Sequence, residues 1–280
     1  MSAALERRTL AGPGLALGSG RRAMRGSQML ALAVLASLAL LALLVPVACP
    51  DGPFARAAAP LTPPGEATWL GTDDLGRSVG CQIGYGLRAS LMIALGTLAI
   101  TLVLGVGIGL LAGYFGGLVD AALARLIAAF QVVPRFFLAI VAAAFFGPSQ
   151  TVLIVVLGLT SWPLVARIVR AETFSIRARP FVMAATALGC STPAILRRHI
   201  LPAALPPVRA ASAVIIGAAV LAEAALGFIG LGDSRSASLG RLIAEAYPFF
   251  ALAPWMSLAP VTVLAALILA VHTAQDRIDS

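Results

Sequence analysis

Long uncharged stretches alternate with short charged segments along this chain. A helix needs about 20 apolar residues to cross roughly 30 Å of hydrocarbon. The stretches Gly26 to Pro50, Ala89 to Val119 and Ala246 to Gln275 each exceed that length without a charged residue. Phe136 to Ala166 is equally long, but the helix-breaking residues 147–150 divide it into two segments. The pattern therefore predicts an all-α polytopic membrane protein.

Six transmembrane helices account for these stretches. Because the 31 residues of the divided stretch are too few for two crossings, the third helix must begin near Ala121 and carry Arg125 and Arg135 into the membrane. The fifth helix carries one charge, Glu223. The predicted spans are residues 28–48, 89–112, 121–146, 151–166, 210–231 and 253–273. The first helix is thus followed by an outer loop, 49–88, and then by a five-helix core, 89–273.

The distribution of arginine predicts the orientation in the membrane. Six helices place both termini on one face, together with the turn at 112–121 and the loop at 167–209. That face, which includes the tails 1–27 and 274–280, holds 13 arginines and five acidic residues, whereas the opposite face holds five arginines and six acidic residues. Since basic residues accumulate on the cytoplasmic side, both termini are expected in the cytoplasm.

Composition excludes several kinds of chemistry. All 20 basic residues are arginine, so neither a P-loop lysine nor a Schiff-base lysine is present. Aromatic residues make up only 6% of the chain and do not alternate with the arginines, which argues against a nucleic-acid partner despite the net charge of +8. Cys49, Cys81 and Cys190 lack metal-ligand spacing and are odd in number, so we expect three unpaired cysteines. No catalytic or metal-binding residue is predicted.

The predicted cytoplasmic loop 167–209 is too long to serve only as a connector. It carries seven of the arginines. Pro180 favours a helix start and Gly189 a helix end, and a second short helix is predicted from Ala194 to Leu201, ended by Pro202. Two short helices would form a compact knob, which is suited to docking into a groove of a partner protein.

Within this loop, the segment FVMAATALGCSTPAILRRHILPAALPP resembles the coupling loop of binding-protein-dependent ABC transporter permeases. The residues that match the motif at its spacing are Ala184, Ala185, Gly189, Leu201 and Pro202. Three further stretches resemble the dipeptide, oligopeptide and nickel branch of that family: residues 71–77 (GTDDLGR), 113–117 (GYFGG) and 221–232 (LAEAALGFIGLG). The resemblance covers roughly residues 70–260.

The resemblance implies a six-helix permease subunit of the bacterial inner membrane, with a coupling-helix loop between helices 4 and 5. Such a subunit pairs with a second homologous permease, recruits two ATPase subunits and receives substrate from an extracytoplasmic binding protein. ATP and Mg²⁺ would be bound by the ATPase subunits, and this chain, in contact with membrane lipid, would carry no cofactor and no catalytic activity. Di- or oligopeptides are the expected substrates, with nickel or a metal-chelate complex as the alternative.

The resemblance also assigns candidate residues for coupling to the ATPase subunits. These are Met183, Ala184, Ala185, Gly189, Arg197, Arg198, His199, Leu201 and Pro202. Met183 departs from the family, which usually has glutamate at this position. A smaller electrostatic contribution to docking is therefore expected here, because methionine fits an apolar groove instead.

Charged residues outside this loop supply the other candidates. A charge inside a membrane helix requires a partner or water, so Arg135 and Glu223 are candidates for the translocation path and could form a pair across helices three and five. In the outer loop, Asp73, Asp74 and Arg77 either dock the binding protein or form a turn in which an aspartate caps the second helix.

Two other classes of protein remain as alternatives. Ser149 and the downstream His272 faintly suggest an intramembrane serine protease, but Pro148 and a turn at the outer surface do not suit a buried nucleophile. A stand-alone secondary transporter would also contain charges at mid-membrane. Such transporters usually show an internal repeat, and the two halves of this sequence show none.

Overall fold

The computed structural model describes residues 26–65, 68–233 and 235–275, so most of the two predicted cytoplasmic tails lies outside the described residues. The regular structure of the described residues is helical apart from two isolated β-bridges, Arg56 to Arg77 and Thr72 to Ser78, and loops join the helices. The helices are α1 (Gly26–Ala48), α2 (Val79–Phe115), α3 (Gly117–Val132), α4 (Arg135–Phe146), α5 (Gln150–Arg177), α6 (Pro180–Ala187), α7 (Thr192–Ile195), the π-helix η1 (Leu196–Ile200), α8 (Leu201–Phe228), α9 (Leu239–Ala246), the 3₁₀-helix η2 (Tyr247–Phe249) and α10 (Trp255–Gln275).

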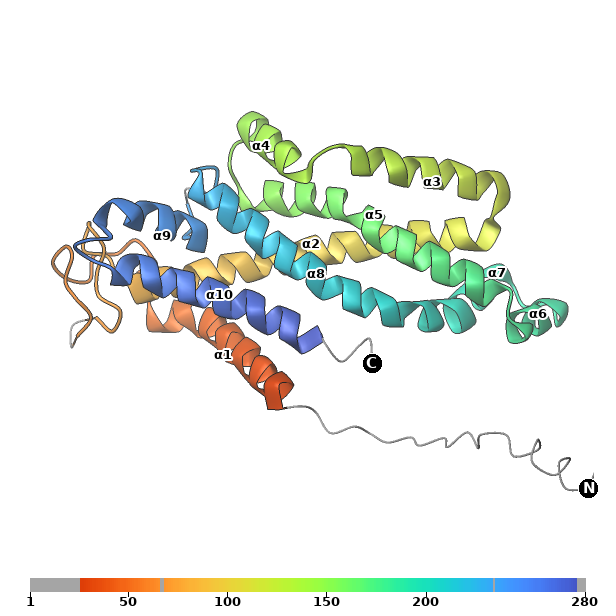
Figure 1. The fold of residues 1–280 in the computed structure, drawn as a ribbon, viewed down its shortest axis with the longest axis horizontal. Coiled ribbons are helices and arrows are strands. Elements are labelled where there is room, and N and C mark those ends of the chain that lie inside the picture. Colours follow the sequence, from red (N-terminus) through yellow and green to blue (C-terminus); the bar gives the residue numbers. More distant parts are fainter. Residues whose placement is uncertain (1–25, 66–67, 234, 276–280) are drawn as a thin grey trace, which may run out of the picture.

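Helices α2, α5 and α8 form the centre of an elongated bundle (Figure 1). Helices α3 and α4 lie on one side of this centre, and α1 and α10 lie on the other. The short helices α6 and α7 are at one end of the bundle, whereas α9 and the loop 49–78 are at the opposite end. The two ends are therefore joined by long central helices that reach from one to the other.

The number of membrane crossings matches the sequence pattern, with one difference in shape. Within the described residues, five helices are long and apolar enough to span a membrane, and the pair α3 and α4 forms a sixth span if it is counted as one. This pair bends by 73° at Val133 and Pro134. Proline lacks an amide hydrogen and its ring clashes with the preceding turn, so the predicted continuous third helix is broken where Arg135 begins α4.

Several helices extend beyond the predicted spans. Helix α2 begins at Val79 rather than Ala89, and at 1.5 Å per residue its 37 residues measure about 55 Å. Helix α5 continues to Arg177, past the predicted end at Ala166. A run of uncharged residues predicts where a helix lies in hydrocarbon, whereas the helix itself can continue into water. The last ten residues of the predicted loop 49–88 and most of the predicted loop 167–209 are accordingly helical.

Helix α2 carries Gly105, Gly107, Gly109 and Gly113, and small residues at such spacings predict close packing of the helix against a neighbour. A Cβ atom on Gly105 would lie 2.6 Å from Cβ of Val165, and one on Gly109 or Gly113 would be similarly close to α5. Gly107, in contrast, faces open space, with nothing within 4 Å of the added atom. The expectation of close helix packing is confirmed for three of these four glycines.

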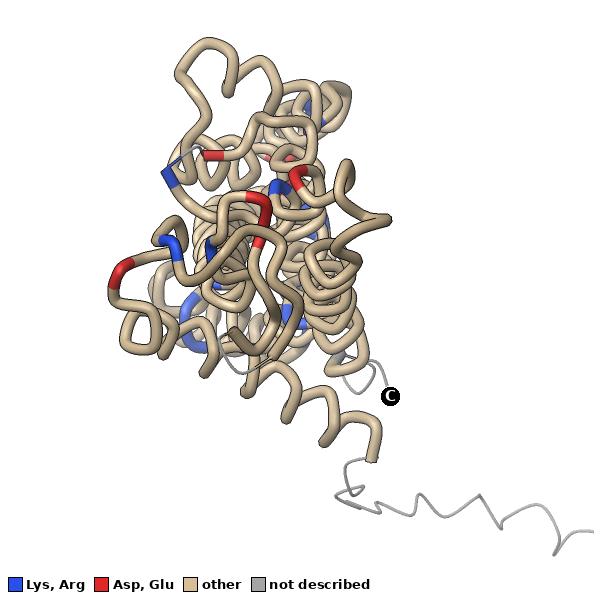
Figure 2. The backbone as a smooth tube through the Cα atoms, turned by 90° about the vertical axis from the view of Figure 1, so that its left-hand side faces the viewer, with Lys and Arg blue, Asp and Glu red and all other residues tan. Residues whose placement is uncertain are grey.

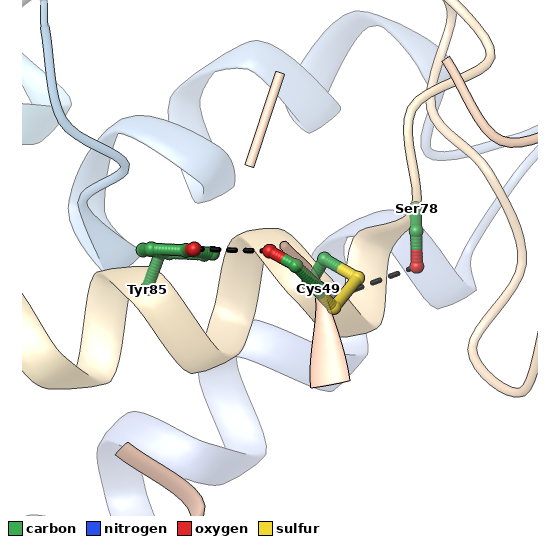
Figure 3. The surroundings of a disulfide bond; sticks show 4 residues. Cys49, Ser78 and Tyr85 are labelled. Carbon is green, nitrogen blue, oxygen red and sulfur yellow. Dashed lines mark hydrogen bonds between the residues drawn. A yellow bond between two sulfur atoms is a disulfide. The ribbon is translucent and has the colours of Figure 1, made fainter. Parts of the chain in front are cut away.

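The expectation of three unpaired cysteines is wrong. Cys49 and Cys81 form a disulfide that links the end of α1 to the first turns of α2 (Figure 3). The two residues are 32 positions apart in sequence, and packing of Val45 against Gly84 brings their Cα atoms to 6.0 Å. An odd number of cysteines does not exclude one bond, and Cys190 is the exposed free thiol of the described chain.

Candidate functional site

One end of the bundle carries a small knob, residues 180–200, formed by α6, α7 and η1 (Figure 1). Helix α6 starts at Pro180, whose fixed φ angle suits the first helical position. It ends at Ala187, and Gly189 then adopts a left-handed conformation with φ of 78°. The predicted start and stop signals of this helix are therefore confirmed.

The second predicted short helix has a different end. Pro202 does not terminate it, because α7, η1 and α8 run on without a break from Thr192 to Phe228. In η1 the amide of Leu201 donates to the carbonyl of Leu196, five residues earlier, which is the wider π-helical spacing. This wider spacing accommodates Pro202 near the start of α8. The knob is therefore continuous with a membrane helix.

The knob has an apolar core of its own. Val182 and Ala185 of α6 are buried against Ile195 and Ile200, together with Ile176 at the end of α5. The side chains of α2 that pack against this core are Leu110 and Tyr114. Of the predicted coupling residues, Ala185 is therefore part of the apolar core of the knob.

Other predicted coupling residues face outwards. The side chain of Met183 is 62% exposed, and that of Leu188, the residue after the end of α6, is 84% exposed. Met183 lines a groove of about 620 Å³ with Tyr114, Phe115 and Arg177. The remaining predicted residues are spread over the knob surface and the start of α8, with Ala184, Gly189, Arg197, Arg198 and Pro202 exposed and His199 and Leu201 half-buried.

Arginines of α5 hold the turn between α2 and α3 next to the knob. Arg170 forms an ion pair with Asp120 in the first turn of α3 through two hydrogen bonds. Arg177 donates to the carbonyl oxygen of Tyr114 and lies over the ring of that tyrosine. The 113–117 motif that resembles the family is thereby fixed to the helix that leads into the knob.

Arg135 faces a cavity of about 350 Å³ within the bundle. The cavity is bounded by α4, α5 and α8, and its lining includes Ser161 and Ala222. Ala222 is the residue before Glu223. Glu223 itself is not among the residues that line this cavity. The ion pairs of the described residues do not include the predicted pairing of Arg135 with Glu223.

Glu223 instead lies in a buried hydrogen-bonded cluster. Its side chain is 3% exposed and accepts hydrogen bonds from Ser90 of α2 at 2.7 Å and from Ser238, immediately before α9, at 2.5 Å. Gly240 allows this close approach, because a Cβ atom there would overlap the carbonyl oxygen of Ala224. The cluster joins three elements at the end opposite the knob. Sequence reasoning missed the two serines, since they are separated from Glu223 by 133 and 15 positions.

The loop before α2 has its own buried carboxylate. Asp73 is 4% exposed and accepts hydrogen bonds from the backbone amides of Leu75 and Arg77 and from the side chain of Gln82. Arg77 pairs with Asp73 and, at 3.6 Å, with Glu245 of α9. These contacts give Asp73 a structural role in the loop, and docking of a binding protein here stays a prediction.

The expected aspartate cap on α2 is wrong. The N-cap is Ser78, whose hydroxyl accepts from the amide of Cys81. Asp74 remains half-buried beside Asp73. The turn interpretation of the 71–77 motif nevertheless fits the geometry, because Asp73 organises the loop that leads into the helix.

These features define a class of protein: a multi-pass helical membrane component with a structured knob between two of its spans. The chain belongs to the family of binding-protein-dependent transport system inner membrane components, whose family model matches residues 105–280. This family consists of non-catalytic membrane subunits of transporters. Membership confirms the predicted family and the multi-pass location in the inner membrane.

Similar proteins include several peptide transport components. The chain is 38% identical over 242 residues to the probable peptide ABC transporter permease protein y4tQ of Sinorhizobium fredii, covering 85% of this chain and 81% of that protein. It is 35% identical to the dipeptide transport system permease protein DppC of Alkalihalophilus pseudofirmus, covering 70% of this chain and 65% of that one. The oligopeptide transport system permease protein OppC of Mycobacterium bovis is 32% identical, with 77% and 75% covered.

A solved structure shares the fold. The inward-facing MetNI methionine ABC transporter aligns with a TM-score of 0.57 and 21% identity, covering 70% of this chain and 94% of the aligned chain. At this identity the likeness concerns the fold alone. It confirms the all-α permease architecture that the hydrophobic pattern and the motif resemblance predict.

Proposed function

We propose that this chain is one permease subunit of an ATP-driven importer of di- or oligopeptides. The observation that carries this proposal is the knob: a small folded element that is continuous with α8, packs on the ends of α2 and α5, and exposes Met183 and Leu188. Exposed apolar side chains beside a groove are suited to docking of a partner protein. Peptide substrates are favoured over nickel or a metal chelate because the three relatives described above are named for peptide transport.

In this proposal the knob lies in the cytoplasm and binds an ATPase subunit, which carries ATP and Mg²⁺. Two observations support that orientation. The loops on the side of the knob hold the excess of arginine. The Cys49–Cys81 disulfide lies at the other end, and such bonds persist in oxidising compartments such as the periplasm. Both termini would then be cytoplasmic.

Movement of the knob would be transmitted by continuous helices. Thr192–Phe228 runs from the knob to the buried Glu223 cluster, which fixes it to α2 and to the segment before α9. Because packed interiors respond to displacement as rigid bodies, a shift imposed at the knob would tilt α8 as a unit. A second homologous permease would complete the path, and an extracytoplasmic binding protein would deliver the peptide at the outer end. Arg135 and its cavity would then line that path.

Reconstitution tests the proposal. The chain is placed in proteoliposomes with its partner permease, both ATPase subunits and the binding protein, and uptake of a radiolabelled dipeptide is measured. We expect uptake only with ATP and with all the subunits. Uptake by this chain alone, driven by an ion gradient, would show a secondary transporter. ATP-driven uptake of nickel without uptake of peptide would instead favour the metal branch.

A further inference from the structure

A separate cavity of about 250 Å³ lies at the end opposite the knob, between α2, the start of α5 and the segment before α9. Helix α2 contributes Tyr85, Arg88, Ala89 and Met92, which share one face because they are three or four positions apart. The other residues that line the cavity are Pro53, Gln150, Arg235, Ser236 and Ala237.

Two arginines in this cavity have no acidic partner among the described residues. The ion pairs found among the described residues involve Arg77, Arg170 and Arg241. They include neither Arg88 nor Arg235. Asp233, two positions before Arg235, accepts a hydrogen bond from the backbone amide of that residue rather than pairing with its guanidinium. Acidic and basic positions both occur at this end of the molecule (Figure 2). Two unpaired guanidinium groups on one small cavity favour an anionic ligand, and guanidinium groups match carboxylates by paired hydrogen bonds.

Hydrogen bonds and a disulfide fix the positions of residues that line the cavity. The hydroxyl of Tyr85 donates to the carbonyl oxygen of Cys49 at 3.0 Å, and the disulfide to Cys81 lies one turn earlier on α2 (Figure 3). On another side, Ala89 and Ala237 are followed directly by Ser90 and Ser238, which both donate to Glu223. A site whose supporting residues are already fixed binds with a smaller entropic cost.

The remaining lining suits the end of a peptide. Pro53, Ala89 and Met92 provide apolar contacts for a side chain, and Gln150 and Ser236 offer neutral hydrogen-bonding groups. The volume of about 250 Å³ is below the roughly 300 to 1,000 Å³ of pockets that enclose a whole drug-sized ligand. The cavity therefore fits one terminal residue and its carboxylate rather than a complete peptide.

We propose that this cavity binds the free C-terminal carboxylate of the transported peptide at the outer end of the permease. The inference rests on the proposed function and adds to it a chemical requirement on the substrate. Arg88 and Arg235 bind the carboxylate, and the apolar wall contacts the last side chain. A peptide with an amidated C-terminus lacks the charge and binds weakly at this site.

Chemical protection tests the site in the complete reconstituted transporter. Phenylglyoxal modifies accessible arginines, and mass spectrometry measures its reaction at each one. We expect the dipeptide Ala-Ala to protect Arg88 and Arg235, whereas Ala-Ala amide gives no protection. Arg56, which is exposed in the same outer region but outside the cavity, serves as the control and should react equally in every sample. Equal reactivity of Arg88 and Arg235 with and without Ala-Ala would overturn the proposal.

Transport kinetics provide a second measurement. The double variant Arg88→Gln with Arg235→Gln should raise KM for the dipeptide by about 10- to 100-fold, because two charge-assisted hydrogen bonds are lost. Arg88→Lys should recover part of the loss, and Arg56→Gln should leave KM unchanged. An unchanged KM in the double variant, while the wild type imports the dipeptide, would contradict the inference and leave the proposed function intact.

The remaining outcomes separate the two proposals further. If the complete wild-type transporter takes up no dipeptide with ATP, the proposed function fails and this inference fails with it. In vesicles of phosphatidylcholine alone, protection by Ala-Ala should persist. If the arginines are instead protected only by added phosphatidylglycerol and not by peptide, the ligand is a lipid phosphate and the carboxylate site is wrong.

Discussion

The two ends of this molecule are stabilised in different ways. At the end opposite the knob, which is the outer end in the proposed function, a disulfide, the buried carboxylates of Asp73 and Glu223, and their hydrogen bonds connect α1, α2, α8 and α9. The knob, residues 180–200, is stabilised by an apolar core, and its described residues form no ion pair. Directional polar contacts fix a geometry, whereas an apolar surface adapts to a partner. The outer end is therefore built as an anchor and the knob as a contact surface.

Substitution of Glu223 should have the largest effect on the anchor. Glu223→Ala leaves a cavity and removes the acceptor of two buried hydroxyl groups, which should cost about 3 to 4 kcal/mol of stability and abolish uptake. The melting temperature of the purified protein measures the loss. Glu172→Ala, at a half-buried position that forms no ion pair in the described structure, is the control and should change the melting temperature little. Equal melting temperatures for the two variants would show that the Glu223 cluster does not stabilise this end.

Removal of the disulfide should have a smaller effect, limited to the outer end. The double variant Cys49→Ala with Cys81→Ala frees a loop of about 30 residues and should cost about 2 to 3 kcal/mol. Thermal unfolding and protease sensitivity of the loop 49–78 measure the change. ATPase docking at the knob should be unaffected, so a loss of docking in this variant would contradict the independence of the two ends.

The contact of α2 with α5, which joins the ends, can be tested with a matched pair of glycines. Gly105→Ala places a Cβ atom 2.6 Å from Val165 and should cost about 1 to 2 kcal/mol. Gly107→Ala meets open space and should be neutral or slightly stabilising, because alanine favours the helix. Thermal unfolding of both variants gives the comparison, and similar losses at the two positions would argue against close packing of the helices.

The smallest effect on stability is expected at Met183. Met183→Ala removes an exposed side chain, so the melting temperature should stay within experimental error. Binding of the ATPase subunits should weaken by up to about tenfold, because a buried apolar contact of this size contributes about 1 kcal/mol. Since methionine carries no charge, the loss measured by calorimetry should be the same at low and high salt. A loss present only at low salt would contradict apolar docking.

The sequence predicts the membrane crossings well because burial in lipid imposes a simple rule on every residue of a span. It also predicts α6, since Pro180 and Gly189 act locally. It does not predict contacts between distant residues. Ser90 donates a hydrogen bond to Glu223, which is 133 positions away in sequence. Cys49 can bond to Cys81 because Gly84, which lacks a side chain, leaves room for Val45. Pro202 predicts the end of a helix, but the π-helical turn before it allows the helix to continue.

In the candidate site, too, the sequence predicts local features but not the contacts between distant residues. The motif spacing marks the knob, but only the structure separates exposed Met183 from buried Ala185 within it. The charges Arg135 and Glu223 are conspicuous in sequence, but only the structure shows that Arg135 lines a cavity while Glu223 accepts hydrogen bonds from Ser90 and Ser238. A pattern identifies which residues are unusual, and packing decides which neighbour each one meets.

The native cysteines offer the most direct test of the central claim, that the knob is a cytoplasmic docking surface. Cys190 is the free, exposed thiol of the described chain and lies in the knob, while Cys49 and Cys81 are bonded to each other. A membrane-impermeant maleimide should label Cys190 in inverted membrane vesicles but not in intact spheroplasts, and bound ATPase subunits should reduce that labelling. Labelling of Cys190 from the outside of spheroplasts would contradict the account.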